Sequence, residues 1–149
     1  MVDDRLSAWS DPEDFGTAMA VAASIAVRAV LDEFDVSFVC GPHASTGSDG
    51  YLALDAVCRA DFGDRGIVES GRQASTLAPD TSLAFFVGGS QTVFTDLLRS
   101  AAAFPPEVRR FGIVVDPGGT SRVTETGGLP VLHLAAMEDL GGLLRWSVR

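Results

Sequence analysis

Residues 82–104 combine an apolar run, two glycines and a helical periodicity, and this combination constrains the fold of the chain more than any other stretch. Residues 83–87 are all apolar, as in a strand that is covered on both faces. Gly88 and Gly89 let the backbone turn without steric cost, and apolar residues then recur at helical spacing as far as Phe104. Two prolines after Phe104 stop the helix. The stretch therefore predicts a buried strand, a glycine turn and an amphipathic helix.

Similar signals predict strands and helices along the rest of the 149-residue chain. Asp11 and Pro12 suit the start of a helix that continues to about Phe34, and its many alanine and aliphatic residues predict that it is mostly buried. In chain order, the later predictions are a strand over residues 36–40, a loop over 41–50, a helix over 51–59 with Cys58 facing inward, a short helix around 69–77, strands over 111–115 and 130–134, and a final helix over 137–146.

Strands that alternate with helices in this way indicate an α/β fold, namely a three-layer α-β-α arrangement with a mainly parallel, doubly wound, Rossmann-like sheet. The length suits one domain over residues 1–149, without a linker or internal repeat. In such a sheet every loop that follows a strand lies at one edge, where ligands usually bind. We call it the loop edge, and we expect it to gather residues 3–5, 41–50, 88–91 and 116–120.

The composition excludes several classes of partner. The net charge is −9, and all basic residues are arginine, without any basic run, which argues against binding to nucleic acid or to anionic membranes. No stretch reaches the ~18 consecutive apolar residues that a membrane span needs, so we expect a soluble, cytoplasmic chain that does not insert into a membrane directly. Cys40 and Cys58 are too few for a disulfide scaffold and are interpreted as buried free thiols.

One catalytic pattern is a hydrolase, because Ser90, Asp116 and His133 follow the chain order of α/β-hydrolases, and Ser90 lies where a nucleophile elbow would. The match is incomplete, since Thr92 stands where the motif requires glycine and His133 falls within a predicted strand. A glycine turn before a helix explains the same residues.

Three binding patterns are also incomplete. Cys40, His43, Cys58 and His133 are zinc-ligand types, but only Cys40 and His43 have the spacing of a ligand pair. Residues 88–90 precede a helix and would favour an anion, yet the chain lacks the glycine-rich nucleotide motifs and any lysine. Asp3, Asp4 and Asp116 offer oxygen ligands for Mg²⁺ at the loop edge, with solvated acidic surface as the alternative.

The run from Val2 through residues 11–15 (Asp-Pro-Glu-Asp-Phe) and 22–26 (Ala-Ala-Ser-Ile-Ala), on to the last strand and helix, resembles a bacterial family. It is similar to the C-terminal part of the family called domain of unknown function fifty-eight, in an actinobacterial version, and that part resembles a von Willebrand factor type A domain. The resemblance covers nearly the whole chain. It implies an excised domain of a longer, membrane-anchored protein, at the cytoplasmic face, with a MoxR-type AAA+ ATPase as partner.

The resemblance also implies a degenerate metal site. Type A domains bind Mg²⁺ through Asp-x-Ser-x-Ser after the first strand, a threonine from a later loop and an aspartate after a central strand. The first element falls on residues 3–7, where Asp3 and Ser7 remain but Arg5 replaces the first serine. The central aspartate would fall within residues 88–90, which contain no carboxylate. We therefore expect no tight Mg²⁺ site and no cofactor.

These observations favour a noncatalytic protein-interaction domain whose loop edge docks a partner protein. The alternative is a small enzyme, either a hydrolase using Ser90 or a nucleotide or anion binder at residues 88–90. If residues 2–4 end a central strand, the sheet edge beside them is unpaired, and a homodimer across it is expected. The candidate interaction site consists of Asp3, Asp4, Arg5, Ser7, His43, Gly88, Gly89, Ser90 and Asp116.

Overall fold

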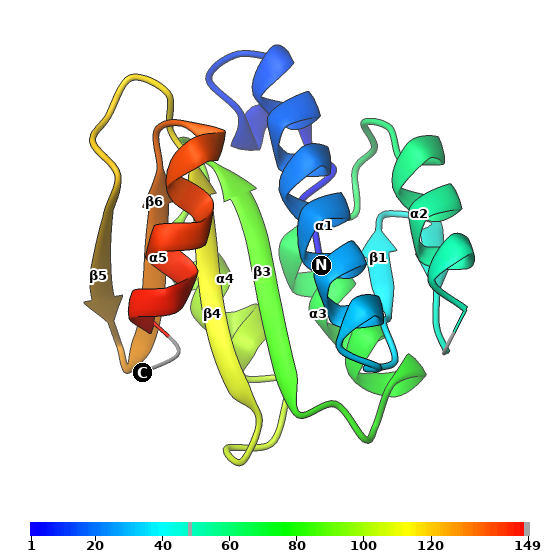
Figure 1. Ribbon diagram of the computed structural model, residues 1–149. Coiled ribbons are helices and arrows are strands. Elements are labelled where there is room, and N and C mark those ends of the chain that lie inside the picture. Colours follow the sequence, from blue (N-terminus) through cyan, green and yellow to red (C-terminus); the bar gives the residue numbers. More distant parts are fainter. Residues whose placement is uncertain (48, 148–149) are drawn as a thin grey trace.

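The computed structural model describes residues 1–47 and 49–147, and it confirms the mixed α/β class (Figure 1). A four-stranded, mostly parallel sheet and a two-stranded hairpin are accompanied by helices. The elements in chain order are η1 (Leu6–Ala8), α1 (Glu13–Leu31), β1 (Phe38–Cys40), β2 (His43–Ser45), α2 (Gly50–Arg59), α3 (Gly66–Leu77), β3 (Leu83–Gly89), α4 (Phe94–Ala101), β4 (Arg109–Val115), β5 (Arg122–Thr126), β6 (Leu129–Leu134), η2 (Met137–Asp139) and α5 (Leu140–Ser147).

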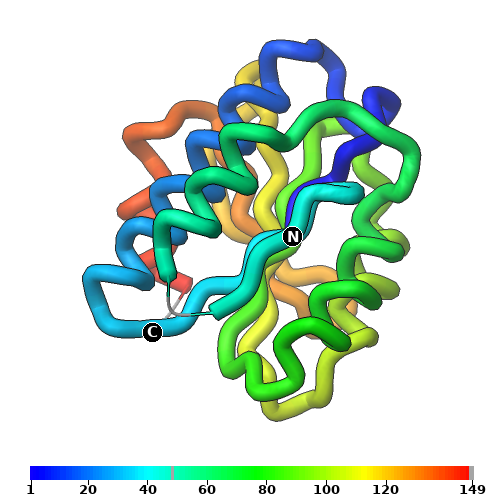
Figure 2. Tube along the Cα trace, turned by 90° about the vertical axis from the view of Figure 1, so that its right-hand side faces the viewer, coloured from blue at the N-terminus to red at the C-terminus, as the bar shows by residue number. Residues whose placement is uncertain are grey.

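The start of the chain joins the hairpin to the larger sheet. Strands β3, β4 and β6 are parallel neighbours, and β5 pairs antiparallel with β6. Val2 pairs in parallel with Val87 of β3, and its N–H donates to the Val39 carbonyl of β1 at 2.9 Å. Residues 1–3 therefore occupy a strand position between β1 and β3, and Figure 2 shows the start of the chain alongside the cyan β1.

Helices cover both faces of the sheet, and a separate apolar core lies on each face. Figure 1 shows α1 and α5 in front of the strands and α3 and α4 behind them. The first core contains Phe15 of α1, Val57 of α2 and Leu140 of α5. The second contains Ile67 of α3 and Leu97 of α4. This arrangement is compatible with the expected three layers, and it leaves the ends of the parallel strands free to carry a site.

Helix α1 is less buried than its composition predicts. The Asp11 side chain accepts a hydrogen bond from the Glu13 N–H at 2.9 Å, as expected for a helix start, but the helix ends at Leu31 and only five of its residues are buried. The prediction of a mostly buried helix is wrong, because α1 forms an outer layer and turns alanines such as Ala20 to solvent. By length and composition α1 is also apolar enough to cross a membrane, but both a buried core helix and an N-terminal signal sequence pass the same test.

Two strands, β2 and β5, were not predicted, and the exposure of Cys58 was not predicted either. The predicted loop over residues 41–50 contains β2, and β5 follows the predicted turn after β4. Both strands are short and lack buried residues, so they give no apolar run. Cys58 is exposed, contrary to prediction, because α2 turns its Val57 and Ala53 to the core instead. Helix α3 is longer than the predicted 69–77.

Candidate functional site

The loop edge is built around the N-terminal segment, residues 1–5. Asp3 N–H donates to the Val87 carbonyl at 2.9 Å, so the segment leaves the sheet beside the end of β3. Further along, Arg5 pairs in parallel with Gly63, and Gly63 N–H donates to the Asp4 carbonyl at 2.7 Å. The segment is thereby held between the ends of β3 and the loop before α3. Its side chains are fixed by backbone pairing on both sides.

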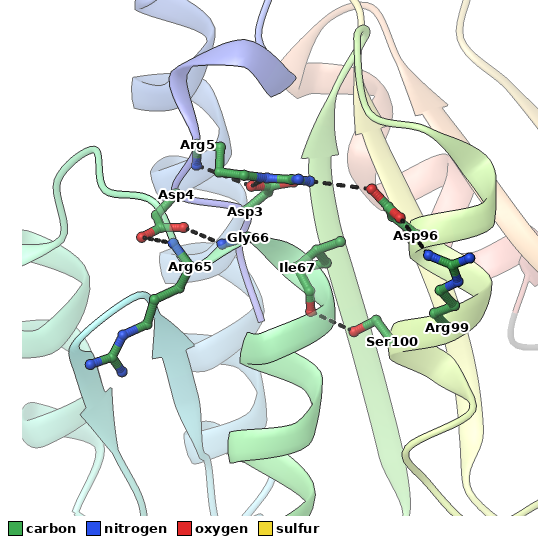
Figure 3. Close-up of polar contacts among 9 residues, drawn as sticks. All are labelled: Asp3, Asp4, Arg5, Arg65, Gly66, Ile67, Asp96, Arg99 and Ser100. Carbon is green, nitrogen blue, oxygen red and sulfur yellow. Dashed lines mark hydrogen bonds and ion pairs between the residues drawn. The ribbon is translucent and has the colours of Figure 1, made fainter.

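Arg5 lies between two carboxylates that are far apart in the sequence, Asp3 and Asp96. Its guanidinium donates to both oxygens of Asp3, from Nε to Oδ1 at 3.2 Å and from Nη2 to Oδ2 at 3.0 Å, in the bidentate geometry that strengthens such pairs. The same Nη2 donates to Asp96 Oδ2 at 3.4 Å, and Asp96 lies in the first turn of α4 (Figure 3). The hydrogen bond to Asp3 raises the pKa of the Arg5 guanidinium above its ordinary value. Arg5 therefore carries the positive charge of this cluster.

Asp4 is fully buried and caps a helix that is distant in sequence. Its Oδ1 accepts the Gly66 N–H at 2.8 Å, and its Oδ2 accepts the Arg65 N–H at 3.4 Å (Figure 3). Arg65 is the N-cap residue of α3 and forms no side-chain capping bond of its own. Free N–H groups and the helix dipole both favour a carboxylate at this position. Asp4 thus satisfies the amino end of α3.

Two glycines provide the space for the Asp4 carboxylate. A Cβ atom at Gly41 or at Gly63 would collide with the Asp4 Oδ2 atom. Gly41 also has a φ of +56°, a conformation that other residues rarely adopt. The loop after β1 and the loop before α3 therefore enclose Asp4. Its buried carboxylate has a structural role, because it accepts hydrogen bonds from the start of α3.

The other N-terminal and glycine-turn residues of the candidate site lie beside this cluster. Ser7 is exposed on η1. The Ser90 hydroxyl donates to Ser10 Oγ at 2.8 Å. A Cβ atom at Gly89 would collide with the Ala8 carbonyl, and one at Gly88 with the Thr92 hydroxyl. The Ser90–Ser10 bond and the close approach of Gly89 to Ala8 join the turn after β3 to the chain around η1, whereas the Gly88–Thr92 contact lies within the turn.

His133 and Asp116 lie on the β4–β6 side of the sheet. His133 Nε2 shares a hydrogen bond with Thr124 of β5 at 2.9 Å, and its ring meets Phe94 edge-on at 6.1 Å between centroids. Burial of the imidazole is the main cause that lowers the pKa of His133, and the positive charge of the nearby Arg122 lowers it further. Asp116 follows β4, and its backbone N–H donates to the Leu134 carbonyl at 2.9 Å. The structure shows no hydrogen bond between Ser90 and His133 within residues 1–47 and 49–147.

His43 belongs to a different surface. It lies on β2 in a shallow pocket of about 330 Å³ between the hairpin and α2, together with the ion-paired Asp55 and Arg59, whose Oδ2 and Nε atoms are 3.0 Å apart. Cys40 is directly opposite His43 in the hairpin register. Burial raises the pKa of the Cys40 thiol to about 12, which opposes the thiolate form that zinc requires. Within the described part of the chain, no three His, Cys, Asp or Glu residues are grouped to hold a metal.

The acidic cluster likewise does not fit Mg²⁺, the ion implied by the resemblance. Both Asp3 oxygens are hydrogen-bonded to Arg5, and both Asp4 oxygens accept backbone N–H groups. A divalent cation would need those oxygens as ligands. The Arg5 guanidinium occupies the position between Asp3 and Asp96 that a cation would require. The geometry is that of an internal ion pair.

Three exposed apolar side chains lie close in sequence to Arg5 and Asp96. Leu6 is 55% exposed, Val93 56% and Phe94 40%. Leu6 follows Arg5, and the other two begin the helix that carries Asp96, so the Arg5–Asp96 contact brings the two segments together. A second contact, from Gln91 N–H to the Ala8 carbonyl at 3.0 Å, joins the same segments. We call Leu6, Val93 and Phe94 the apolar rim.

Sequence reasoning missed Asp96, Arg65 and Gly66. Asp96 is an acidic residue in the first turn of a predicted helix, where acids are common for reasons of the helix dipole alone. Arg65 and Gly66 fall in a stretch whose helical pattern is weak. Only Asp96 had a usable signal, because its helix follows the central glycine turn and must begin at the loop edge.

A search of the chain against known protein families, curated proteins and solved structures finds no match.

Proposed function

We propose that this chain is a noncatalytic protein-interaction domain of von Willebrand type A-like, Rossmann-like fold, with a degenerate metal site, and that its loop edge docks a partner protein. The observation that carries the proposal is the Arg5 guanidinium between Asp3 and Asp96, 3.0 and 3.4 Å from their oxygens. It neutralises the acidic cluster from within, so the cluster maintains the shape of the edge instead of recruiting a cation. A rigid edge is suited to recognition of another protein surface.

The apolar rim supplies the contact area for such a partner. Leu6, Val93 and Phe94 are more exposed than most side chains of their type, and an apolar patch bordered by charged residues is typical of protein interaction sites. Arg5 and Asp96 lie beside it, and a partially exposed ion pair of this kind suits the polar border of an interface. The partner that we propose is a MoxR-type AAA+ ATPase, in line with the family resemblance.

A pull-down with matched variants tests this proposal. The tagged chain serves as bait in extracts of the parent cell, beside a double variant, Leu6→Ser with Val93→Ser, and a control, Leu31→Ser. Leu31 is 71% exposed at the far end of α1, about 28 Å from the start of that helix. We expect an AAA+ ATPase to be recovered by the wild type and by Leu31→Ser, and to be lost with the double variant.

Two outcomes contradict the proposal. Repeated failure of the wild type to recover an AAA+ ATPase or an envelope protein would contradict the proposed partner. Equal recovery by all three baits would contradict the proposed role of the apolar rim in binding it. A thermal-shift screen of nucleotides and ester substrates addresses the enzyme alternative, because a ligand that binds the folded chain raises its stability as RT ln(1 + [L]/Kd). A nucleotide shift that Ser90→Ala abolishes would favour the small enzyme instead.

A further inference from the structure

The outer face of α1 has the composition of a covered helix, but most of the helix is exposed to solvent. Residues 15–27 contain no charged side chain, and only five of the nineteen residues of α1 are buried. A surface helix normally carries charged residues on the face away from its core. Val27 is 43% exposed and Leu31 is 71% exposed, and their spacing of four residues places them on one face. This face of α1 is therefore apolar toward its carboxyl end.

The exposed apolar surface continues onto the segments beside α1. Phe34 follows the helix and is 60% exposed, and Tyr51 in the first turn of α2 is 85% exposed. A Cβ atom at Gly50 would lie 2.6 Å from Val30 Cγ2, so the start of α2 touches the last turns of α1, and Figure 2 shows the two helices side by side. We define the outer patch as Val27, Leu31, Phe34 and Tyr51.

The end of α1 holds a carboxylate next to Phe34. The Glu33 N–H donates to the Val30 carbonyl at 3.0 Å, and the Phe34 N–H donates to the Ala29 carbonyl at 2.9 Å. Glu33 has a φ of +65°, a conformation that glycine usually supplies where a helix ends with these two hydrogen bonds. Closure of the helix does not require a carboxylate there, so the Glu33 side chain adds negative charge beside the outer patch without a need of the fold.

Four acidic residues border the outer patch. They are Asp32, Glu33, Asp35 and Asp49. Arg28 is the only basic residue in the sequence from 27 to 35 and from 49 to 55, and its Nε atom pairs with Asp32 Oδ2 at 2.8 Å. Among the residues that the structure describes, Glu33 and Asp35 have no side-chain hydrogen bond or ion pair. The border of the outer patch is therefore negatively charged.

Helix α1 extends the outer patch as a ridge without charged groups. Ala20 and Ser24 are exposed on the same face as Val27, by helical spacing. The Ser24 hydroxyl donates to the Ala20 carbonyl at 2.8 Å, so this polar group is satisfied within the helix. Helices pack against such ridges with their axes about 8–10 Å apart. A second helix can therefore lie along α1 without leaving a buried polar group unsatisfied.

We propose that the outer patch docks a basic amphipathic helix of a partner protein, with apolar side chains on one face and lysine or arginine beside them. The apolar side chains of this helix cover the outer patch, and its cations face the acidic border. A second copy of this chain does not fit, because two acidic borders would then meet and each copy carries a net charge of −9.

The outer patch is independent of the proposed docking at the apolar rim. Figure 1 shows that α1 runs from the loop edge to the opposite edge of the sheet, in front of the strands, whereas α4 lies behind them. The basic helix and the AAA+ ATPase are therefore separate partners, and loss of binding at one surface leaves the other intact.

A synthetic helical peptide of about 16 residues tests the proposal, with leucine and alanine on one face and lysine on the other. A second peptide has glutamate in place of every lysine. Fluorescence anisotropy measures the binding of each peptide to the full chain, and amide chemical shifts locate the contact. The two variants are Leu31→Arg and, as the matched control, Leu6→Arg at the apolar rim, where Leu6 is 55% exposed. Both variants add one positive charge, so general electrostatic attraction changes equally.

We expect the lysine peptide to shift the amides of residues 27–35 and 49–52, and to bind at least about tenfold more tightly than the glutamate peptide. Leu31→Arg should weaken this binding about tenfold or more, and Leu6→Arg less than about twofold. Failure of the lysine peptide to bind at about 1 mM, or an equal loss in both variants, would overturn the proposal. Binding of the chain to phosphatidylcholine vesicles that Leu31→Arg abolishes would also overturn it, because a lipid surface would then cover the outer patch.

Discussion

Arg5 is the side chain that keeps the acidic cluster of the loop edge in one arrangement. The Asp3 carboxylate is fully buried, and Arg5 supplies two side-chain hydrogen bonds to it. In Arg5→Ala those two bonds are lost, and of the described groups only the backbone N–H of residue 5 still donates to Asp3 Oδ1. We expect unfolding by urea to show a loss of about 2 to 3 kcal/mol, as for a buried carboxylate that loses its charged partner.

The matched control for this prediction is Arg99→Ala. Arg99 also lies near a carboxylate of the cluster, but at 3.9 Å from Asp96 and with an exposed side chain. Exposed pairs of this kind contribute about 0 to 1 kcal/mol. If the two variants lost equal stability, Arg5 would have no special role in the cluster.

The two cysteines are predicted to differ in reactivity. Cys58 is exposed on α2, whereas Cys40 is buried in β1, and burial raises the pKa of the Cys40 thiol to about 12. Only the thiolate reacts with alkylating reagents. We expect mass spectrometry to show one modified thiol per native chain and two after denaturation, and no modification of native Cys58→Ser. Modification of native Cys40 would mean that β1 opens readily.

For single residues, the sequence predicted which polar side chains lie at the loop edge, but not the residues to which they are hydrogen-bonded. Asp3, Asp4 and Arg5 were identified because they follow an expected strand end. Their partners Asp96 and Gly66 are distant in sequence, and only the tertiary fold brings them within hydrogen-bonding distance. A sequence motif gives spacing along one segment, and these contacts join three segments.

The capping of helices α2 and α3 gives a comparison between two aspartates. Asp49 caps α2 from the adjacent position, accepting the Tyr51 N–H at 3.0 Å on the surface. Asp4 caps α3 across the fold from a fully buried position. By urea unfolding we expect a loss of about 1 kcal/mol for Asp49→Ala, the usual value of an N-cap. For Asp4→Ala we expect about 2 to 3 kcal/mol, because buried N–H groups would then lack an acceptor.

A loss for Asp4→Ala that is no larger than that for Asp49→Ala would show that water replaces the carboxylate easily. Asp4→Asn serves as the isosteric control, since its amide oxygen retains one acceptor at nearly the same volume. Its stability should lie between those of the wild type and Asp4→Ala.

The strand of residues 1–3 makes stability depend on pH. Burial lowers the pKa of the Met1 amino group from 8.0 to about 6. Between pH 6 and pH 8 the unfolded chain binds the additional proton, so stability should rise with pH through this window, by about 2 to 3 kcal/mol in total. Chemical denaturation at several pH values measures the rise. Acetylation of Met1 should largely remove it, whereas an equal rise in the acetylated chain would assign it to other groups.

Strands buried in the sheet were predictable, and those at its two outer edges were not. β3, β4 and β6 have burial patterns that give near-continuous apolar runs. β2 and β5 each pair on one side only and have no buried residue, so their sequences resemble loops. For α1 the reverse holds, since its apolar composition overstated its burial. In strands, an apolar pattern therefore indicates which faces are covered by other elements, and it does not indicate which segments are hydrogen-bonded to a neighbouring strand.

Across the whole molecule, residues 1–3 combine the two sheets into one continuous series of strands, in the order β2, β1, residues 1–3, β3, β4, β6 and β5. The sequence predicted that residues 2–4 end a central strand, and the dimer was expected at an edge left unpaired beside them. That position has β1 on one side and β3 on the other. Val2 and Asp3 are themselves paired within this chain, whereas the expected homodimer stays a prediction.

The outermost strands are the remaining candidates for a dimer, and both are poor ones. β2 has three residues, and β5 begins with Arg122 and contains Glu125, in agreement with the short or charged edges that prevent strand pairing between molecules. We therefore expect multi-angle light scattering to give the monomer mass of 15.6 kDa at high micromolar concentration. A dimer mass would contradict this. Hydrogen exchange would then locate the contact, since an edge-to-edge dimer protects β2 or β5 and a dimer through the apolar rim protects the start of α4.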